Sequence, residues 1–233
     1  VLLAADGLHS EVRAQMHPNQ PGPHWGGQIL WRGATPGPPV RSGAAFTLVG
    51  TLDQRFVHYP ISSIDPTTGL QLQNWIAELT VDASGGLAAS DWNREDDIDA
   101  FLPAFDDWAF DWLDIESLVR GAPTVWEFPM VDRDPVDRWV DGRVCLIGDA
   151  AHVMYPVGSN GASQAIVDAR VMGSHLVEHG VGPDALLAFE DQLIEPMSAL
   201  VLRNRGHGPI GILGLVDERS GGYFDQIDDV IPL

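Results

Sequence analysis

The sequence predicts a mixed α/β protein in which helices pack on a buried sheet and an antiparallel sheet is inserted between two parts of the chain. Arg143–Ile147 is a short apolar run without alternation, bounded by glycines, which is typical of a strand buried on both faces. Between Gly27 and Leu79, by contrast, several short runs alternate apolar and polar residues, which is typical of antiparallel strands.

A carboxylate and a glycine loop follow the buried strand. Gly148-Asp149 turns the chain where the strand ends, and ligands bind at that edge in open α/β sheets. Few bulky side chains occur in the loop that follows, which contains Pro156, Gly158, Ser159, Asn160 and Gly161. A helical pattern then begins at Ala162 and stops at Gly180, with apolar or small residues at Ala162, Ala165, Ile166, Ala169, Met172 and Leu176. The free N–H groups of such a helix start favour an anion.

This segment, GDAAHVMYPVGSNGASQAIVDA, resembles the second flavin motif of the class A flavoprotein monooxygenases, the para-hydroxybenzoate hydroxylase-like family. The resemblance implies that Gly148 and Asp149 meet FAD, with Asp149 bonded to the ribityl chain. It also implies that the loop from Pro156 to Gly161 lies along the isoalloxazine ring and that the helix from Ala162 faces the pyrimidine edge. The alternative is a plain βα unit with a glycine-rich turn.

The first residues, VLLAADGLHSEVR, are similar to the Asp-Gly motif of the same family. The resemblance implies that Asp6, Gly7 and Arg13 lie near the pyrophosphate and ribose of FAD. From the residues alone, we expect a strand that ends in a turn and a short helix, Glu11–Met16, capped by Ser10. The alternative is a hairpin turn, which Asp-Gly also favours.

Four further segments are similar to the branch of the family that contains the phenazine-1-carboxylate and salicylate hydroxylase-like enzymes. They are WRG at 31–33, YPIS at 59–62, PMVDRDP at 129–135 and MYPVGSNGASQAI at 154–166.

The family opens with a strand and a Gly-x-Gly-x-x-Gly turn that hold the ADP half of FAD, and no such turn precedes Asp6. We therefore expect the C-terminal part of a Rossmann-like FAD-binding domain, which binds FAD weakly by itself. The expected segments are 1–20 and 129–205 in that domain, 21–128 in the inserted sheet domain, and 206–233 as a tail.

The resemblance implies that NAD(P)H reduces FAD and that a flavin C4a-hydroperoxide then hydroxylates a small aromatic substrate with one atom of dioxygen. A carboxylated or phenolic substrate would need polar groups from the sheet, and the candidates are Arg32, Arg55, His58 and Tyr59. Arginine can pair with a carboxylate through two bonds, and His or Tyr can take a proton from a ring hydroxyl. Ordinary polarity of a sheet surface is the alternative for each of them.

Other functions stay open at this point. A reductase, an epoxidase or a halogenase could share the flavin cradle, although a halogenase would need a catalytic lysine and the chain has none. A non-catalytic binding module that kept the fold is the alternative outside enzymes.

Composition and charge exclude several classes of partner. A net charge of -20 disfavours nucleic acid and anionic membranes, and no apolar run reaches the roughly 18 residues of a membrane span. The single cysteine, Cys145, suits a reducing cytoplasmic compartment. We expect no metal site, and we interpret His175 and His179 as a solvated pair on a helix. A homodimer is left open.

We predict that the melting temperature rises between low and moderate NaCl. Thirty-three acidic residues repel one another, and salt screens exposed charges over about 10 Å at 0.1 M. Thermal unfolding monitored by circular dichroism across a NaCl series measures this effect. A flat or falling melting temperature would show that the acidic residues are already compensated locally.

Overall fold

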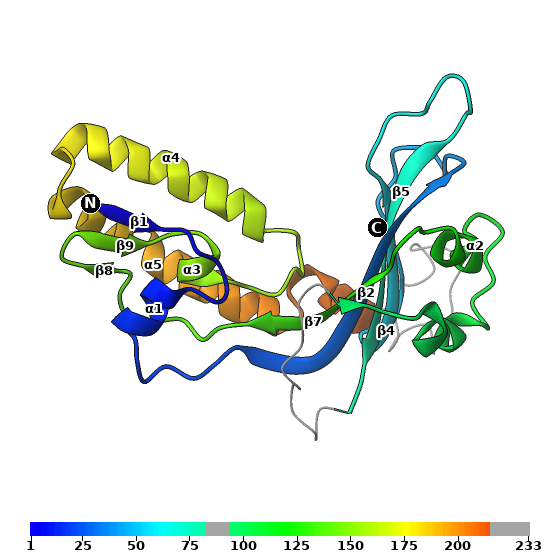
Figure 1. Cartoon of the computed structure of the whole chain (residues 1–233), viewed down its shortest axis with the longest axis horizontal. Helices are drawn as coiled ribbons and strands as arrows, with labels where there is room; N and C mark the ends of the chain where they lie inside the picture. The colour runs from blue at the N-terminus through cyan, green and yellow to red at the C-terminus, as the bar shows by residue number, and fades with distance from the viewer. Residues whose placement is uncertain (83–93, 215–233) are drawn as a thin grey trace. The chain divides into compact units, whose positions relative to one another are not determined.

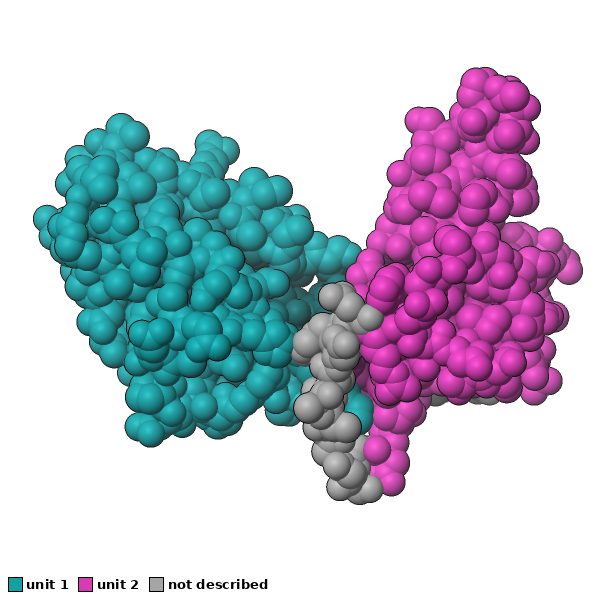
Figure 2. Space-filling view, viewed as in Figure 1, with its two compact units in different colours: residues 1–25, 131–215 teal, residues 26–130, 216–233 magenta. Residues whose placement is uncertain are grey.

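The computed structural model describes residues 1–82 and 94–214, and these residues form two compact units. Unit 1 contains Val1–Trp25 and the segment that begins at Val131, and unit 2 contains Gly26–Met130 (Figure 2). The chain passes from one unit to the other within strand β2, His24–Gly37, and returns within β7, Trp126–Asp132. The sequence predicted that the chain passes between the two domains at residues 20/21 and returns at residues 128/129. Most of the expected tail, from residue 215 onward, lies outside the described residues.

Unit 1 is built on a three-stranded sheet in the order β1-β9-β8 (Figure 1). The central strand β9, Val144–Leu146, is parallel to β1, Leu2–Ala4, and antiparallel to β8, Val140–Asp141. Cys145 and Leu146 are fully buried, which confirms the predicted buried strand. The helices of this unit are α1 (Glu11–Met16), α3 (Asp149–His152), α4 (Gly161–His179), α5 (Pro183–Arg205) and the 3₁₀ turn η4 (Gly208–Gly211).

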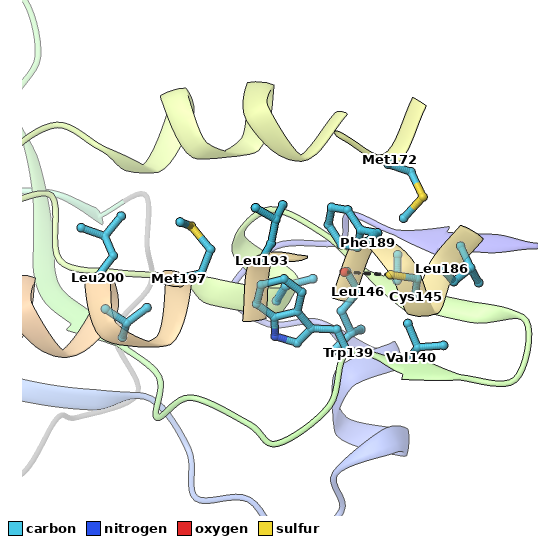
Figure 3. Close-up of a cluster of buried hydrophobic side chains, with 14 of the residues drawn as sticks. Trp139, Val140, Cys145, Leu146, Met172, Leu186, Phe189, Leu193, Met197 and Leu200 are labelled. Atoms are coloured by element: carbon cyan, nitrogen blue, oxygen red, sulfur yellow. Dashed lines mark hydrogen bonds between the residues drawn. The ribbon is translucent and has the colours of Figure 1, made fainter. Parts of the chain in front are cut away.

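The core of unit 1 lies between this sheet and α5 (Figure 3). In the sequence, apolar residues at helical spacings after Pro183 predict a helix with one apolar stripe. Every residue of that stripe is buried in α5: Leu186, Phe189, Leu193, Met197, Leu200 and Val201. Helix α5 continues to Arg205 with Pro196 inside it. Trp139 and Phe189 pack with their ring centroids 5.8 Å apart. Burial of this stripe fixes α5 against the sheet and so provides the rigid support for the turn that follows β9.

Helix α4 forms over the predicted range, but its apolar residues are not all buried. Met172 is buried, whereas Ile166 is 71% exposed, and Ala162 and Ala169 are exposed as well. The second buried residue of α4 is the charged Asp168. Small and apolar residues occur on all sides of this helix, so the sequence pattern could not identify which side faces the protein.

Unit 2 contains a six-stranded sheet in the order β3-β4-β5-β2-β7-β6. Its remaining strands are β3 (Thr47–Gly50), β4 (Gln54–Pro60), β5 (Gln71–Thr80) and β6 (Arg94–Glu95), and the β2–β5, β3–β4, β4–β5 and β6–β7 pairs are antiparallel. The sheet predicted from alternation is therefore present.

One face of this sheet carries an aromatic core. Trp31 stacks on Phe101 with a centroid distance of 4.8 Å, and Phe56 stacks on Trp75 at 6.0 Å. Phe105, Trp108 and Trp112 follow Ile98 at helical spacings, which predicts a helix there. Two 3₁₀ turns form instead, η2 (Ile98–Ala100) and η3 (Leu102–Phe105), followed by helix α2 (Ile115–Arg120). Helix α2 was not predicted, although Asp114 caps it by accepting from the Ser117 N–H at 2.9 Å.

Among the helices of the described ranges, none combines the length and the apolar character that a membrane span needs.

Gly33→Ala is predicted to destabilise the protein by about 1–3 kcal/mol, because overpacking a filled core has a cost of that order. Gly33 pairs directly with Trp75 across the sheet, so a methyl group there would overlap the indole and lie 3.0 Å from the Ala122 Cβ. The control is Gly173→Ala in α4, where a Cβ meets nothing within 4 Å and helix propensity favours alanine by about 0.5–1 kcal/mol. Urea unfolding of both variants measures the difference. Equal stabilities would contradict the packing at Gly33.

Candidate functional site: a carboxylate turn and a glycine loop

The turn after β9 presents one carboxylate to solvent. Gly148 has a φ of +57°, in the left-handed region that glycine adopts without strain. The next four residues form α3, in which Ala150, Ala151 and His152 are buried while Asp149 is exposed. Within the described residues, the Asp149 side chain makes no hydrogen bond or ion pair. Its oxygens are therefore available to an external donor such as a sugar hydroxyl.

The loop from Pro156 to Gly161 is held by buried side chains at its start. Tyr155 and Val157 are buried, whereas Pro156, Gly158 and Ser159 are exposed. Gly158 and Ser159 have φ values of +88° and +54°. A Cβ at Gly158 would lie 3.1 Å from the Pro209 Cγ, so close packing within the protein accounts for a glycine at this position.

Gly161, the first residue of α4, has no such internal explanation. A Cβ there would meet nothing within 4 Å, and its φ is not positive. Asn160 makes no side-chain cap bond, and no acidic residue occupies the first turn. The first-turn N–H groups thus lie beside open space at Gly161, and the neighbouring Ala162 is exposed. Among the described residues, the N–H donors of this first turn are unpaired, and Gly161 has no side chain to block access to them. The electron-rich edge of a cofactor could therefore approach them closely.

Asp6 and Gly7 form the turn before α1. Gly7 has a φ of +78°, and the Asp6 carboxylate accepts from the Val12 N–H at 3.3 Å. Burial raises the pKa of Asp6, but hydrogen bonds from Ser10 and Val12 outweigh it and hold the pKa below its usual value. Ser10 caps α1 by accepting from the Arg13 N–H at 2.9 Å, as predicted. The direct contact of Asp6 and Gly7 with FAD stays a prediction.

Arg13 is buried within unit 1. Its side chain is 1% exposed, and its guanidinium donates to four oxygens of unit 1. These are the carbonyls of Ala150 (2.8 Å), Ala151 (2.7 Å) and Asp134 (2.8 Å) and the Gln20 Oε1 (2.8 Å). Burial lowers the pKa of Arg13 to about 10, so the group remains charged at neutral pH. Arg13 therefore holds α3 in place, and its predicted proximity to FAD stays a prediction.

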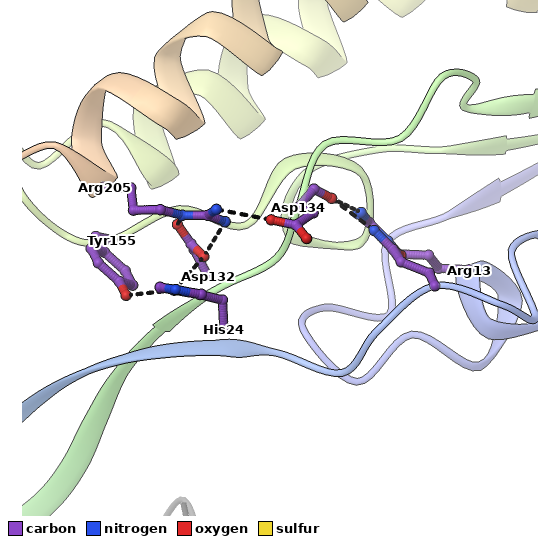
Figure 4. A network of polar contacts seen from close by, with 7 residues as sticks. Arg13, His24, Asp132, Asp134, Tyr155 and Arg205 are labelled. Carbon is purple, nitrogen blue, oxygen red and sulfur yellow. Dashed lines mark hydrogen bonds and ion pairs between the residues drawn. The ribbon is translucent and has the colours of Figure 1, made fainter. Parts of the chain in front are cut away.

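A second ionic network fixes the carboxyl end of α5 (Figure 4). Arg205 donates to both oxygens of the fully buried Asp132, at 2.7 and 2.9 Å, and to Asp134 at 2.8 Å. The bonds to Asp132 raise the pKa of Arg205. The His24 Nδ1 lies 3.0 Å from the Tyr155 hydroxyl and 3.7 Å from Asp132. The network holds the Tyr155 side chain in place, and Tyr155 is the residue directly before the glycine loop.

In unit 2, three of the four predicted substrate residues share one face of the sheet. Strand alternation and register place Arg32, Arg55 and Tyr59 on the face that carries Glu78 and Asn74. Arg55 is buried and forms an ion pair with Glu78. Burial raises the pKa of Glu78, while the charges of Arg55 and Arg32 oppose that rise. Arg32 is exposed, and its guanidinium makes no hydrogen bond or ion pair to the part of the chain that the structure describes.

His58 lies on the opposite face, beside the aromatic core. Its Nε2 is 2.8 Å from the Gln73 Oε1, and its Nδ1 is 3.4 Å from the Thr47 Oγ1. Burial lowers the pKa of His58, which favours the neutral ring. The structure therefore does not bring His58 together with Arg32, Arg55 and Tyr59.

The remaining candidates for chemistry are His175 with its neighbours, and Cys145. The ligand atoms of His175, Glu178 and His179 lie within 4.8 Å of one another on α4, but Glu178 and His179 are exposed and His175 is bonded to Gln192 at 2.9 Å. The absence of a metal site stays a prediction. Burial raises the pKa of the Cys145 thiol to about 12, so it is no nucleophile.

The fold and the site together define an α/β protein with an exposed carboxylate and a glycine loop at the carboxyl end of a parallel strand. Residues 2–203 match the FAD-binding domain family, and the chain belongs to that family. The predicted resemblance to the class A FAD-dependent aromatic monooxygenases is thus confirmed.

Several relatives are named monooxygenases or hydroxylases. The chain is 39% identical to phenazine 1,6-dicarboxylic acid hydroxylase of Lysobacter antibioticus over 206 residues, 88% of this chain and 50% of that protein. It is 28% identical to a 3-amino-4-hydroxybenzoate 2-monooxygenase of Streptomyces platensis over 98% of this chain and 57% of that protein. The chain spans about half the length of these curated relatives.

Solved structures show the same fold. Klebsiella pneumoniae HpxO, complexed with FAD and uric acid, has a TM-score of 0.71 at 26% identity, covering 91% of this chain and 51% of that one. A salicylate hydroxylase substrate complex has a TM-score of 0.70 at 21% identity, covering 95% and 60%. At that identity the second likeness concerns the fold alone.

Arg13→Met is predicted to lower the unfolding free energy by about 3 kcal/mol or more. The change removes the guanidinium from the buried carbonyls of Ala150 and Ala151, and hydrogen bonds to charged groups contribute about 1.5–3 kcal/mol each. Chemical denaturation measures the loss. The matched control is Arg143→Met, because Arg143 is exposed and makes one long bond, 3.4 Å, to the Val181 carbonyl. Equal effects of the two substitutions would contradict the role of Arg13.

Proposed function

We propose that this chain supplies the ribityl-binding turn, the ring-facing loop and the substrate sheet of an FAD-dependent monooxygenase. The enzyme would consume NAD(P)H and hydroxylate a small aromatic substrate that carries a carboxylate or a phenolic hydroxyl. Membership of the FAD-binding domain family and the names of the relatives support the reaction class. The observation that carries the proposal is the exposed, unpartnered Asp149 carboxylate in the turn that precedes an open glycine loop.

When bound, FAD would supply the redox chemistry that activates dioxygen for transfer of one oxygen atom to the ring. The protein supplies binding and orientation. Asp149 would accept hydrogen bonds from ribityl hydroxyls, and Gly158 and Gly161 would let the backbone lie close to the flat ring. The first-turn N–H groups of α4 favour electron density on the ring edge nearest to them.

Unit 2 supplies the groups that suit an aromatic acid. Arg32 presents an exposed guanidinium that can form two bonds with a carboxylate. Tyr59, on the same face, is the group that could exchange a proton with a ring hydroxyl. Arg55 already pairs with Glu78, and its contribution is to hold that carboxylate in place beneath Arg32.

A non-catalytic flavin-binding module is the second candidate, because the family match concerns an FAD-binding domain and not a reaction. A reductase or an epoxidase of the same fold is the other alternative. NAD(P)H oxidation with and without aromatic acids separates the three, since a module consumes none and a reductase needs no aromatic substrate.

Asp149→Ala is predicted to weaken flavin binding by roughly tenfold or more while the unliganded protein keeps its melting temperature. A hydrogen bond to a charged partner contributes about 1.5–3 kcal/mol, and 1.4 kcal/mol corresponds to a factor of ten. FAD titration followed by NMR chemical shifts gives the dissociation constant, and calorimetry gives the melting temperature. Asp149→Asn, which keeps an acceptor, should lie between the wild type and Asp149→Ala.

The control for this experiment is Asp137→Ala, at an exposed aspartate of the same unit. Unchanged affinity in Asp149→Ala would end the assignment of Asp149 to the cofactor. Parallel losses of affinity and melting temperature would show that Asp149 only stabilises the turn.

A further inference from the structure

A buried carboxylate lies inside the flavin-binding unit, and neither the sequence motif nor the proposed mechanism explains it. Asp168, in α4, is 1% exposed. Its Oδ2 accepts from the Gly148 N–H at 2.7 Å and lies 2.7 Å from the Nε2 of His152. Among the described residues, its Oδ1 has no hydrogen-bond partner. A buried carboxylate is costly unless it is paired, so its presence here calls for a specific interaction.

His152 provides the pairing. It is the last residue of α3, it is buried, and its ring lies against Trp139 with a centroid distance of 5.4 Å. This ring contact and the bond to Asp168 hold the imidazole in one orientation. The carboxylate is therefore placed to accept the backbone N–H of Gly148.

The bond to Gly148 falls at the residue that sets the direction of the turn. Gly148 adopts a φ of +57°, and the Asp149 side chain is the next one along the chain. A helix of four residues such as α3 has no stability of its own. It is held at its start by Asp168 and at its end by Arg13, which donates to the carbonyls of Ala150 and Ala151. Between these two buried charges, Asp149 is the residue of α3 that is exposed.

We infer that Asp168 and His152 form a positioning pair that fixes the Gly148 turn and thereby aims the Asp149 carboxylate at the flavin. The pair acts through the backbone and touches no cofactor atom. The aim toward a flavin rests on the proposed function, whereas the fixing of the turn is a property of this chain alone.

Amide hydrogen exchange of Gly148, measured by NMR on the unliganded chain, tests the positioning. In Asp168→Asn, the weaker neutral acceptor should speed exchange of the Gly148 N–H by about tenfold. His152→Leu removes the donor to Asp168 and should have a similar effect, whereas His152→Gln keeps a donor and should preserve protection. Glu178→Gln, an exposed change on the same helix, is the control and should have none.

The amides of Leu146 and Ile147 report whether an effect is local. They donate to the carbonyls of Trp139 and Ala4, both at 2.9 Å, and their exchange should stay unchanged in all four variants. Unaltered Gly148 exchange in Asp168→Asn would overturn the inference. A uniform acceleration at Gly148, Leu146 and Ile147 would also overturn it, because it would show general destabilisation.

Titration with flavin mononucleotide, followed at the Gly148 and Asp149 amides, tests the link to the cofactor. Asp168→Asn should weaken binding severalfold in the wild-type background and have no effect when Asp149→Ala is already present. Equal losses in both backgrounds would overturn Asp149 as the group through which the pair acts. If the wild-type chain shows no response to the flavin, the proposed function fails, and the exchange experiment still decides the positioning by itself.

Discussion

The buried guanidinium of Arg13 is the interaction on which the rest of unit 1 depends. It donates to carbonyls of Ala150 and Ala151 that lie 137 and 138 residues further along the chain. The first strand and helix are thereby fixed to the turn after β9, and the Asp-Gly and Gly-Asp segments become parts of one structure. Because the guanidinium is fully enclosed, any loss of its partners leaves either a buried charge or unpaired carbonyls. The position of α3 is therefore set by hydrogen bonds from a buried charged side chain that belongs to a distant part of the sequence.

Unit 1 buries three charged side chains, and each has a different kind of partner. Arg13 donates to backbone carbonyls, Asp168 pairs with His152, and Asp132 pairs with Arg205. All three act on the scaffold around the turn and the loop, and none of them is exposed. The carboxylate of Asp149, in contrast, is left to solvent. The scaffold is thus held by other charged side chains, and within the described residues Asp149 stays free for the ligand role proposed for it.

Sequence patterns predicted the parts of this structure that depend on local burial. Strand β9 and the stripe of α5 were correct because each has one continuous apolar surface that meets one core. The face of α4 could not be predicted, since Ile166 is exposed and Asp168 is buried on a helix rich in small residues. The motif contains Asp168 and His152, but no pattern indicates that two residues 16 positions apart form a buried pair. The bonds of Arg13 to Ala150 and Ala151 could not be predicted for the same reason, because these partners are distant in sequence.

The polar face of the sheet in unit 2 combines a buried ion pair with an exposed arginine. Glu78 and Arg55 form the buried pair, and burial raises the pKa of Glu78. Arg32 lies on the same face, and its exposed guanidinium makes no hydrogen bond or ion pair within the described residues. A strongly acidic protein, such as this chain with its net charge of -20, repels anionic ligands at long range. If the substrate is an aromatic acid, as proposed, Arg32 is the group that could hold its carboxylate through two bonds against that repulsion.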